Sequence, residues 1–201
     1  MSPQPENSHA ADAVEPPPYS PEERAELLRL AHEAIEAALA ARKLELNPTS
    51  ERLLEPRGAF TTLHLEGNLR GCVGYVYPVK PLYRTVAETA TAAAFNDTRF
   101  LPVSAEEAPR LKVEISVLSP VVPIAAEDIE AGRHGLVVTL GSRRGLLLPQ
   151  VAVEFGWDAR TFLQETCLKA GLPPDAWERG AVIEAFTAEV FHEEGFLEAK
   201  K

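Results

Sequence analysis

The sequence predicts an α+β protein in which an antiparallel or mixed sheet packs against helices. Segments with helical spacing of apolar residues and segments with strict alternation are interspersed along the chain. The alternating segments pair through short turns rather than through long helical crossovers, which favours antiparallel neighbours. A hydrophobic fraction of 45% supplies enough apolar side chains for a sizeable core. A doubly wound parallel sheet is the weaker alternative, because its strands need crossover connections.

The acidic balance of the chain restricts the classes of partner. The formal net charge is −10, which disfavours nucleic acid and anionic membranes, although a local basic pocket stays compatible with it. Only two cysteines occur, too few for a disulfide framework, and no CxxC pair is present for zinc or redox chemistry. We therefore expect neither a structural metal nor a bound cofactor.

Both ends of the chain look different from its middle. Residues 1–19 are rich in Pro, Glu, Ser and Ala and carry no apolar pattern, which is typical of a disordered tail. They lack the basic start and apolar stretch of a secretory signal, and no apolar run approaches the roughly 20 residues that cross a bilayer. We expect a cytoplasmic protein with one domain over residues 20–195 and a short tail at 196–201.

The first half of that domain reads as a helix, a hairpin and a second helix. Ser20 is a predicted helix cap with a glutamate three residues later, and apolar spacing continues to about residue 42. Residues 59–66 and 69–77 alternate as two strands around a two-residue turn at Gly67-Asn68. A second helix follows over residues 81–96.

The second half contains shorter elements. Ser104 and Glu107 form another capping box on a short helix. The remaining elements expected are a strand at 112–119, a helical turn at 126–130, a hairpin of 136–140 with 146–148 joined by residues 141–145, a helix at 158–170 and a final strand at 181–191.

The segment Arg70-Gly71-Cys72-Val73-Gly74 is the strongest candidate site. Glycines weaken a strand, and a strand tolerates them where a ligand or another backbone approaches closely. Arg70 can hold an anion through its planar fork of donors, and a thiol beside a guanidinium can be a nucleophile. The alternative is that Cys72 is a small core residue and that the glycines mark a bulge.

The register of the hairpin separates these alternatives. If Gly67-Asn68 is the whole loop, Leu63 pairs with Cys72, and the thiol belongs to the core. A one-residue bulge would instead move Cys72 to the side of His64. Cys72 and His64 are therefore the two candidate catalytic residues.

Two loops add candidate ligand-binding residues. Asp97 and Arg99 follow the second helix and are able to bind a polar ligand or one another. His134 lies between two glycines, where a mobile imidazole suits proton transfer. His9, His32 and His192 match no metal-binding spacing and are interpreted as structural or solvated.

The assembled motifs resemble the AMMECR domain family, also known as AmmeMemoRadiSam system protein A. The resemblance covers residues 20–195 and rests on these stretches: Phe60–Leu63, Leu69–Gly74, Ala93–Phe100, Val113–Ser119, His134–Leu136, Leu147–Ala152 and Cys167–Leu172. Val73 stands where the family often has isoleucine, and Thr98 stands where proline is common.

The resemblance implies a larger and a smaller lobe, and a site around Arg70, Gly71, Cys72 and Gly74. It also implies a Memo-type protein and a radical SAM protein as partners. An iron–sulfur cluster would belong to that partner, because two cysteines cannot hold one. We expect a protein that binds a small molecule or presents a substrate to its partner. Whether it also catalyses a reaction itself is left open. The alternative is a non-catalytic interaction module that binds a partner protein.

Overall fold

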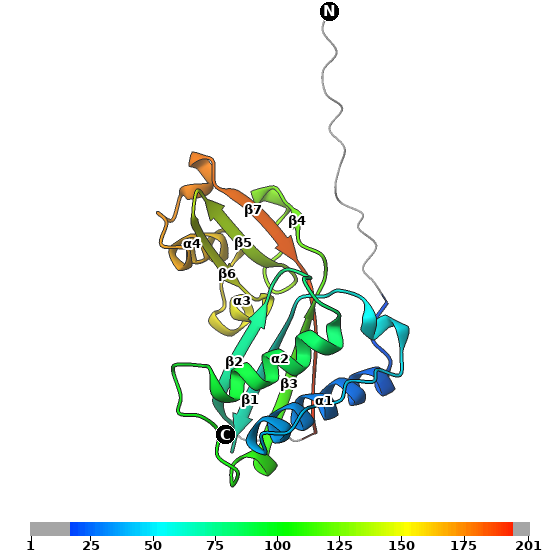
Figure 1. Ribbon diagram of the computed structural model, residues 1–201. Helices are drawn as coiled ribbons and strands as arrows, with labels where there is room; N and C mark the ends of the chain where they lie inside the picture. The colour runs from blue at the N-terminus through cyan, green and yellow to red at the C-terminus, as the bar shows by residue number, and fades with distance from the viewer. Residues whose placement is uncertain (1–16, 195–201) are drawn as a thin grey trace, which may run out of the picture. The chain divides into compact units, whose positions relative to one another are not determined.

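The computed structural model describes residues 17–194, which form two compact units (Figure 1). The larger unit contains residues 18–120 and 188–194, and the smaller unit contains residues 121–187. Each unit has its own antiparallel sheet and its own hydrophobic core. The fold is therefore α+β with two lobes, as the sequence predicts, and neither sheet is parallel.

The larger unit is a four-stranded sheet in the order β2-β1-β3-β8 with two helices. Its elements are α1 (Pro21–Leu39), β1 (Ala59–Leu65), β2 (Asn68–Tyr75), α2 (Leu82–Phe95), β3 (Leu111–Leu118) and β8 (Ala188–His192), with short 3₁₀ turns at Glu51–Leu54 and Ala108–Arg110. The capping box expected at Ser104 and Glu107 is present, but it leads into the second 3₁₀ turn rather than into an α-helix.

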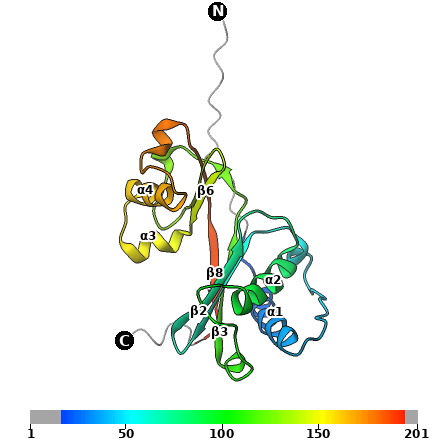
Figure 2. The same ribbon diagram turned by 60° about the vertical axis from the view of Figure 1, so that its left-hand side comes forward.

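Both helices of the larger unit cover the same face of its sheet, as the edge-on view in Figure 2 shows. Alternation explains which face this is, because Ala59, Thr61 and Leu63 of β1 are buried while their neighbours are only partly buried. The Thr61 hydroxyl lies 2.8 Å from the hydroxyl of Thr89 on α2. The other face carries no helix of this unit.

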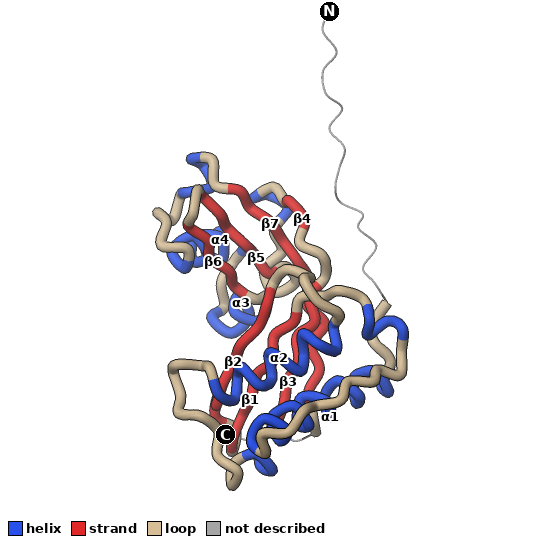
Figure 3. The backbone as a smooth tube through the Cα atoms, in the orientation of Figure 1, coloured by secondary structure: helices blue, strands red, loops and turns tan. Residues whose placement is uncertain are grey.

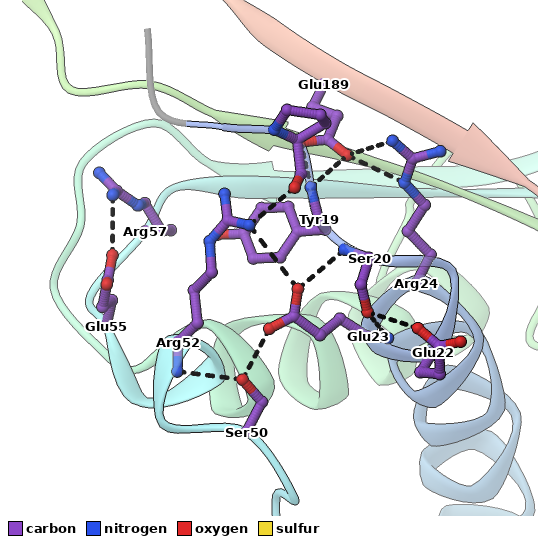
Figure 4. Close-up of polar contacts among 11 residues, drawn as sticks. Tyr19, Ser20, Glu22, Glu23, Arg24, Ser50, Arg52, Glu55, Arg57 and Glu189 are labelled. Carbon is purple, nitrogen blue, oxygen red and sulfur yellow. Dashed lines mark hydrogen bonds and ion pairs between the residues drawn. The ribbon is translucent and has the colours of Figure 1, made fainter. Parts of the chain in front are cut away.

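The start of α1 is fixed by a polar network that includes Tyr19 (Figure 4). The capping box between Ser20 and Glu23 is reciprocal, as predicted. Both carboxylate oxygens of Glu189 accept the Tyr19 backbone N–H at 3.0 Å, and the Arg52 guanidinium lies 4.0 Å from the Tyr19 ring centre. The Tyr19 residue is only 5% exposed, so the tail boundary expected at residue 19 is placed too late. Residues 1–16 lie outside the described residues.

The smaller unit is a second four-stranded sheet, in the order β4-β7-β5-β6 (Figure 3). Its elements are β4 (Val122–Pro123), β5 (Gly135–Leu140), β6 (Arg143–Leu147), α3 (Pro149–Phe155), α4 (Ala159–Lys169) and β7 (Val182–Phe186), with 3₁₀ turns at Ala126–Asp128 and Ala176–Arg179. Helix α4 contributes Phe162, Leu163 and Cys167 to the core of this unit.

Three expectations for this half of the chain need correction. The hairpin turn is Gly141-Ser142 alone, because Leu140 pairs directly with Arg143. Helix α3 begins at Pro149, in a segment for which no element is predicted from the sequence. The single strand expected at 181–191 is interrupted at Thr187, because β7 pairs with β5 whereas β8 pairs with β3 of the larger unit.

Candidate functional site

The β1–β2 hairpin differs from its predicted register at two points. Its turn is Glu66-Gly67, with φ angles of 51° and 77°, and Leu65 pairs with Asn68. A bulge then follows, because His64 pairs with Leu69 while Leu63 pairs with Gly71. Arg70 is the extra residue of β2. The earlier turn and the inserted residue together shift the pairing by one position relative to the prediction.

That shift decides where the thiol points. Cys72 pairs with Thr62 and not with Leu63, which is fully buried under the helices. The Cys72 side chain therefore belongs to the helix-free face of the sheet, where the Thr62 hydroxyl donates to Sγ at 3.3 Å. Cys72 is half-buried, and neither it nor Cys167 forms a disulfide. The bulge interpretation is the correct one, and the core interpretation of Cys72 is wrong.

The helix-free face is defined by outward residues of four strands: Phe60, Thr62 and His64 of β1, Cys72 and Gly74 of β2, Lys112, Glu114 and Ser116 of β3, and Val190 and His192 of β8. Cys72, Thr62, Glu114 and His192 are direct neighbours in one row across β2, β1, β3 and β8. The row places a thiol, a hydroxyl, a carboxyl and an imidazole side by side. His64 lies on the same face, two residues from Thr62.

Sequence reasoning missed two members of this row, Glu114 and His192. Glu114 lies with Lys112 and Ser116 on the polar side of an alternating strand, and this was the available signal. The assignment of His192 to the row depends on its pairing with β3, which no local pattern reveals.

The two acidic groups of the row are both harder to ionise than usual. Burial raises the pKa of the Cys72 thiol, and the Thr62 hydrogen bond and Arg99 oppose this only in part. The thiol is therefore protonated at neutral pH and is not a ready nucleophile. Burial also raises the pKa of Glu114, against the influence of His192. The face offers hydrogen-bonding groups in a partly desolvated setting.

Asp97 and Arg99 bind each other and the backbone of Cys72. The Asp97 carboxylate accepts the Cys72 N–H at 2.9 Å, and Arg99 donates to the Cys72 carbonyl at 3.4 Å. Arg99 also donates to both carboxylate oxygens of Asp97, at 2.9 and 2.6 Å. These hydrogen bonds hold the pKa of Asp97 far below its usual range, and the bond from the Arg99 side chain has the largest effect. The pair thus occupies the open edge of β2 and fixes the position of Cys72.

Arg70 is also paired. Its guanidinium donates twice to Glu107, at 3.0 and 3.1 Å, and its side chain is only 13% exposed. The hydrogen bonds from Arg70 and from the Ser104 backbone hold the pKa of Glu107 at about 2. Arg70 therefore stabilises the bulge region through Nε and Nη2, whereas its third nitrogen, Nη1, is buried and has no hydrogen-bond partner among the described residues. An anionic group would supply that partner, so anion binding by Arg70 stays a prediction.

Gly71 and Gly74 each lie so close to another residue of the larger unit that there is no room for a side chain. A Cβ on Gly71 would lie 2.1 Å from the carbonyl oxygen of Ala93 on α2. A Cβ on Gly74 would lie 2.2 Å from the ring of Phe60, its cross-strand neighbour. The close approach inferred from the sequence is real, but it involves the helix backbone and an aromatic ring of the same unit.

The remaining candidates are distributed elsewhere. His134 belongs to the smaller unit, where its Nδ1 accepts the Glu130 backbone N–H at 3.0 Å. His32 lies 2.9 Å from a Glu193 carboxylate oxygen, whereas His9 lies outside the described residues.

Within residues 17–194, no three His, Cys, Asp or Glu side chains form a group able to hold a metal ion. In the same range, no helix is long and apolar enough to cross a membrane.

These features define a class of protein: a two-unit α+β protein whose larger unit has an Arg-Gly-Cys bulge and a polar helix-free face. The chain belongs to the AMMECR1 family, whose profile matches residues 28–191. It is 45% identical over 188 residues to a protein of Methanothermobacter thermautotrophicus, covering 89% of this chain and 98% of that protein. It is 46% identical over 180 residues to protein MK0488 of Methanopyrus kandleri, covering 84% of this chain and 87% of that protein.

A solved structure has the same fold. The crystal structure of the uncharacterized protein PH0010 from Pyrococcus horikoshii aligns with a TM-score of 0.80 at 43% identity. The alignment covers 86% of this chain and 92% of that one. The names of these relatives state no activity, so function must be argued from the site itself.

Proposed function

We propose that the protein binds a small molecule or a substrate group on the helix-free face of its larger unit, and that it acts with a Memo-type protein and a radical SAM protein. One observation carries the site: the row of Cys72, Thr62, Glu114 and His192 across four strands on a face that α1 and α2 leave uncovered. Hydrogen-bonding groups that are partly desolvated and converge on one surface are typical of ligand sites.

The chemistry of the row favours binding over covalent catalysis by the protein alone. The protonated Cys72 thiol lacks the low pKa of a nucleophilic cysteine. The proposed role is therefore to hold and present a substrate, while redox chemistry is carried out by the radical SAM partner and its cluster.

The test compares compounds and proteins that co-purify from native cells with three forms of the chain. Thr62→Leu places a larger apolar side chain in the row, and Thr98→Leu makes the same change at an exposed loop position. A compound that co-purifies with the wild type and Thr98→Leu, but not with Thr62→Leu, is expected. A compound retained by a folded Thr62→Leu variant would place the site elsewhere.

A second candidate, a non-catalytic interaction module, is favoured by an apolar surface on the smaller unit. Val153 and Phe155 of α3 are 69% and 62% exposed, and the Phe155 ring stacks on Trp157 with centroids 4.8 Å apart. Exposed aromatic residues of this kind are common anchors in protein interfaces. If this role is the whole function, Phe155→Ser abolishes capture of the partner proteins. Thr62→Leu then leaves that capture unchanged, and no compound co-purifies with any form of the chain.

A further inference from the structure

The two arginines closest to Cys72 are already bound by carboxylates. The sequence placed two guanidinium groups there, but Arg70 is paired with Glu107 and Arg99 with Asp97. Each pair is net neutral, and each guanidinium has already bound two carboxylate oxygens of its partner. At the Nε and Nη2 atoms of either arginine, an anion would have to displace a carboxylate from a chelating geometry, which costs two charge-assisted hydrogen bonds. The exception is Nη1 of Arg70, which is buried without a partner among the described residues, but Arg70 is not a member of the row that contains Glu114.

Glu114 is the one carboxylic acid of the row, and His192 beside it offsets its charge only through space. Lys112, two residues away on the same face, is exposed. Glu114 lies on β3, an inner strand of the sheet, and it is partly buried. Within residues 17–194 its carboxylate forms no hydrogen bond and no ion pair, and its interactions with His192 and Cys72 are electrostatic only. The His192 imidazole uses Nδ1 on the backbone carbonyl of Glu193, 3.0 Å away.

A half-buried carboxylate without a hydrogen-bond donor is costly, because it loses part of its hydration and gains no compensating partner. A protonated amine is the complement that restores both the charge and the hydrogen bonds. A metal ion would need further ligands, and none of the described side chains form such a group. The net charge of −10 also raises the local concentration of small cations around the protein.

We infer that the ligand of the helix-free face carries a protonated amino group, which Glu114 binds beside the Thr62 hydroxyl and the Cys72 thiol. This inference rests on the proposed function, and it specifies the chemical class of the compound bound there. The four strands fix the positions of these side chains through their backbone register, so the site is formed before the ligand arrives.

The test uses three probes with the same ring and different charge: benzylamine, benzyl alcohol and benzoate. Each is titrated into the full-length, isotope-labelled protein while backbone amide chemical shifts are followed. We expect benzylamine to bind most tightly and to shift the amides of Thr62, Cys72, Glu114 and His192. Glu114→Gln should weaken benzylamine about ten- to hundredfold, the loss expected for a hydrogen bond to a charged group.

Glu154→Gln is the matched control, since Glu154 is an exposed carboxylate of α3 in the smaller unit, and it should bind benzylamine as the wild type does. If benzyl alcohol or benzoate binds this face as tightly as benzylamine, or if Glu114→Gln has no effect, the amine preference is wrong while the site stands. If all three probes leave this face unperturbed, the amine inference is also wrong. The proposed function then depends on the separate co-purification result with Thr62→Leu.

Discussion

Glu114 combines two properties that are rarely found together in a stable sheet. It occupies an inner strand, and its carboxyl group is partly buried without a hydrogen-bonding partner among the described residues. A residue that contributes little to stability at such a position is typical of a functional site, because binding sites are often less stable than they could be.

Replacing Glu114 by Gln should therefore stabilise the fold at neutral pH. The pKa of Glu114 is raised in the folded protein, so the ionised form is penalised above that pKa and the penalty disappears as pH falls below the unfolded value of about 4.3. We expect the melting temperature of Glu114→Gln to be higher by about 1–3 °C at pH 7 and unchanged near pH 4. A lower melting temperature at pH 7 would show that the carboxylate is well paired in the fold.

Gly71 illustrates a requirement for close packing rather than for ligand access. Gly71→Ala would place a methyl group 2.1 Å from the Ala93 carbonyl oxygen, and α2 would have to move away from β2. Overpacking of this kind should reduce the free energy of unfolding by about 2–3 kcal/mol in urea titrations. Gly141→Ala is the comparison, since its Cβ meets nothing within 4 Å and only its φ of +60° is unfavourable. Equal losses in the two variants would contradict the packing explanation.

At the level of elements, the edge of β2 is held by charged residues of the segment that follows α2. Arg99 and Asp97 bind the backbone of Cys72, and Arg70 binds Glu107. Together they satisfy an edge that would otherwise be available to another strand.

The Arg70–Glu107 pair should make stability depend on pH in the acid range. The pKa of Glu107 is lowered to about 2 in the folded protein, so its stabilisation is complete above the unfolded value and is lost as pH falls towards 2. Allowing for partial solvent exposure, we expect Glu107→Gln to cost about 1 kcal/mol at pH 7 and progressively less below pH 4 in urea titrations. A cost that stays constant from pH 7 to pH 3 would mean that the pair contributes through packing alone.

The sequence identified elements well where local signals were sufficient. The capping box at Ser20 and the cap at Asp158 place the starts of α1 and α4 correctly. The sequence raised a bulge in the first hairpin as an alternative but could not place it at Arg70, because one inserted residue reverses the face of every later residue without leaving a local pattern. It also could not divide β7 from β8, since the break at Thr187 depends on which strand each half pairs with.

At the level of the whole molecule, the larger unit is closed by residues from both ends of the described chain. Tyr19 donates its backbone N–H to Glu189, and His32 lies against Glu193. The last strand, β8, is therefore held in place in part by α1 and by Tyr19, which precedes that helix.

This arrangement makes a specific prediction about shortening the chain. A protein that begins at Pro17 should melt as the full-length protein does, since the described contacts of the network begin at Pro18. A protein that begins at Ser20 should be less stable by about 2–4 kcal/mol, because it loses a buried aromatic ring and its stacking on Arg52. Equal thermal melting of the two shortened proteins would show that Tyr19 does not belong to the core.

The most direct test of the central claim is the accessibility of Cys72 in the native protein. Iodoacetamide labelling at pH 8.5 can be followed separately at Cys72 and Cys167 by mass spectrometry of the two peptides. If Cys72 faces the helix-free side of the sheet, it should react at least about tenfold faster than the fully buried Cys167, although slowly for a cysteine because its pKa is raised. Saturating benzylamine should slow the reaction at Cys72 alone. The same rate at both cysteines, or labelling of Cys72 only after denaturation, would contradict the account.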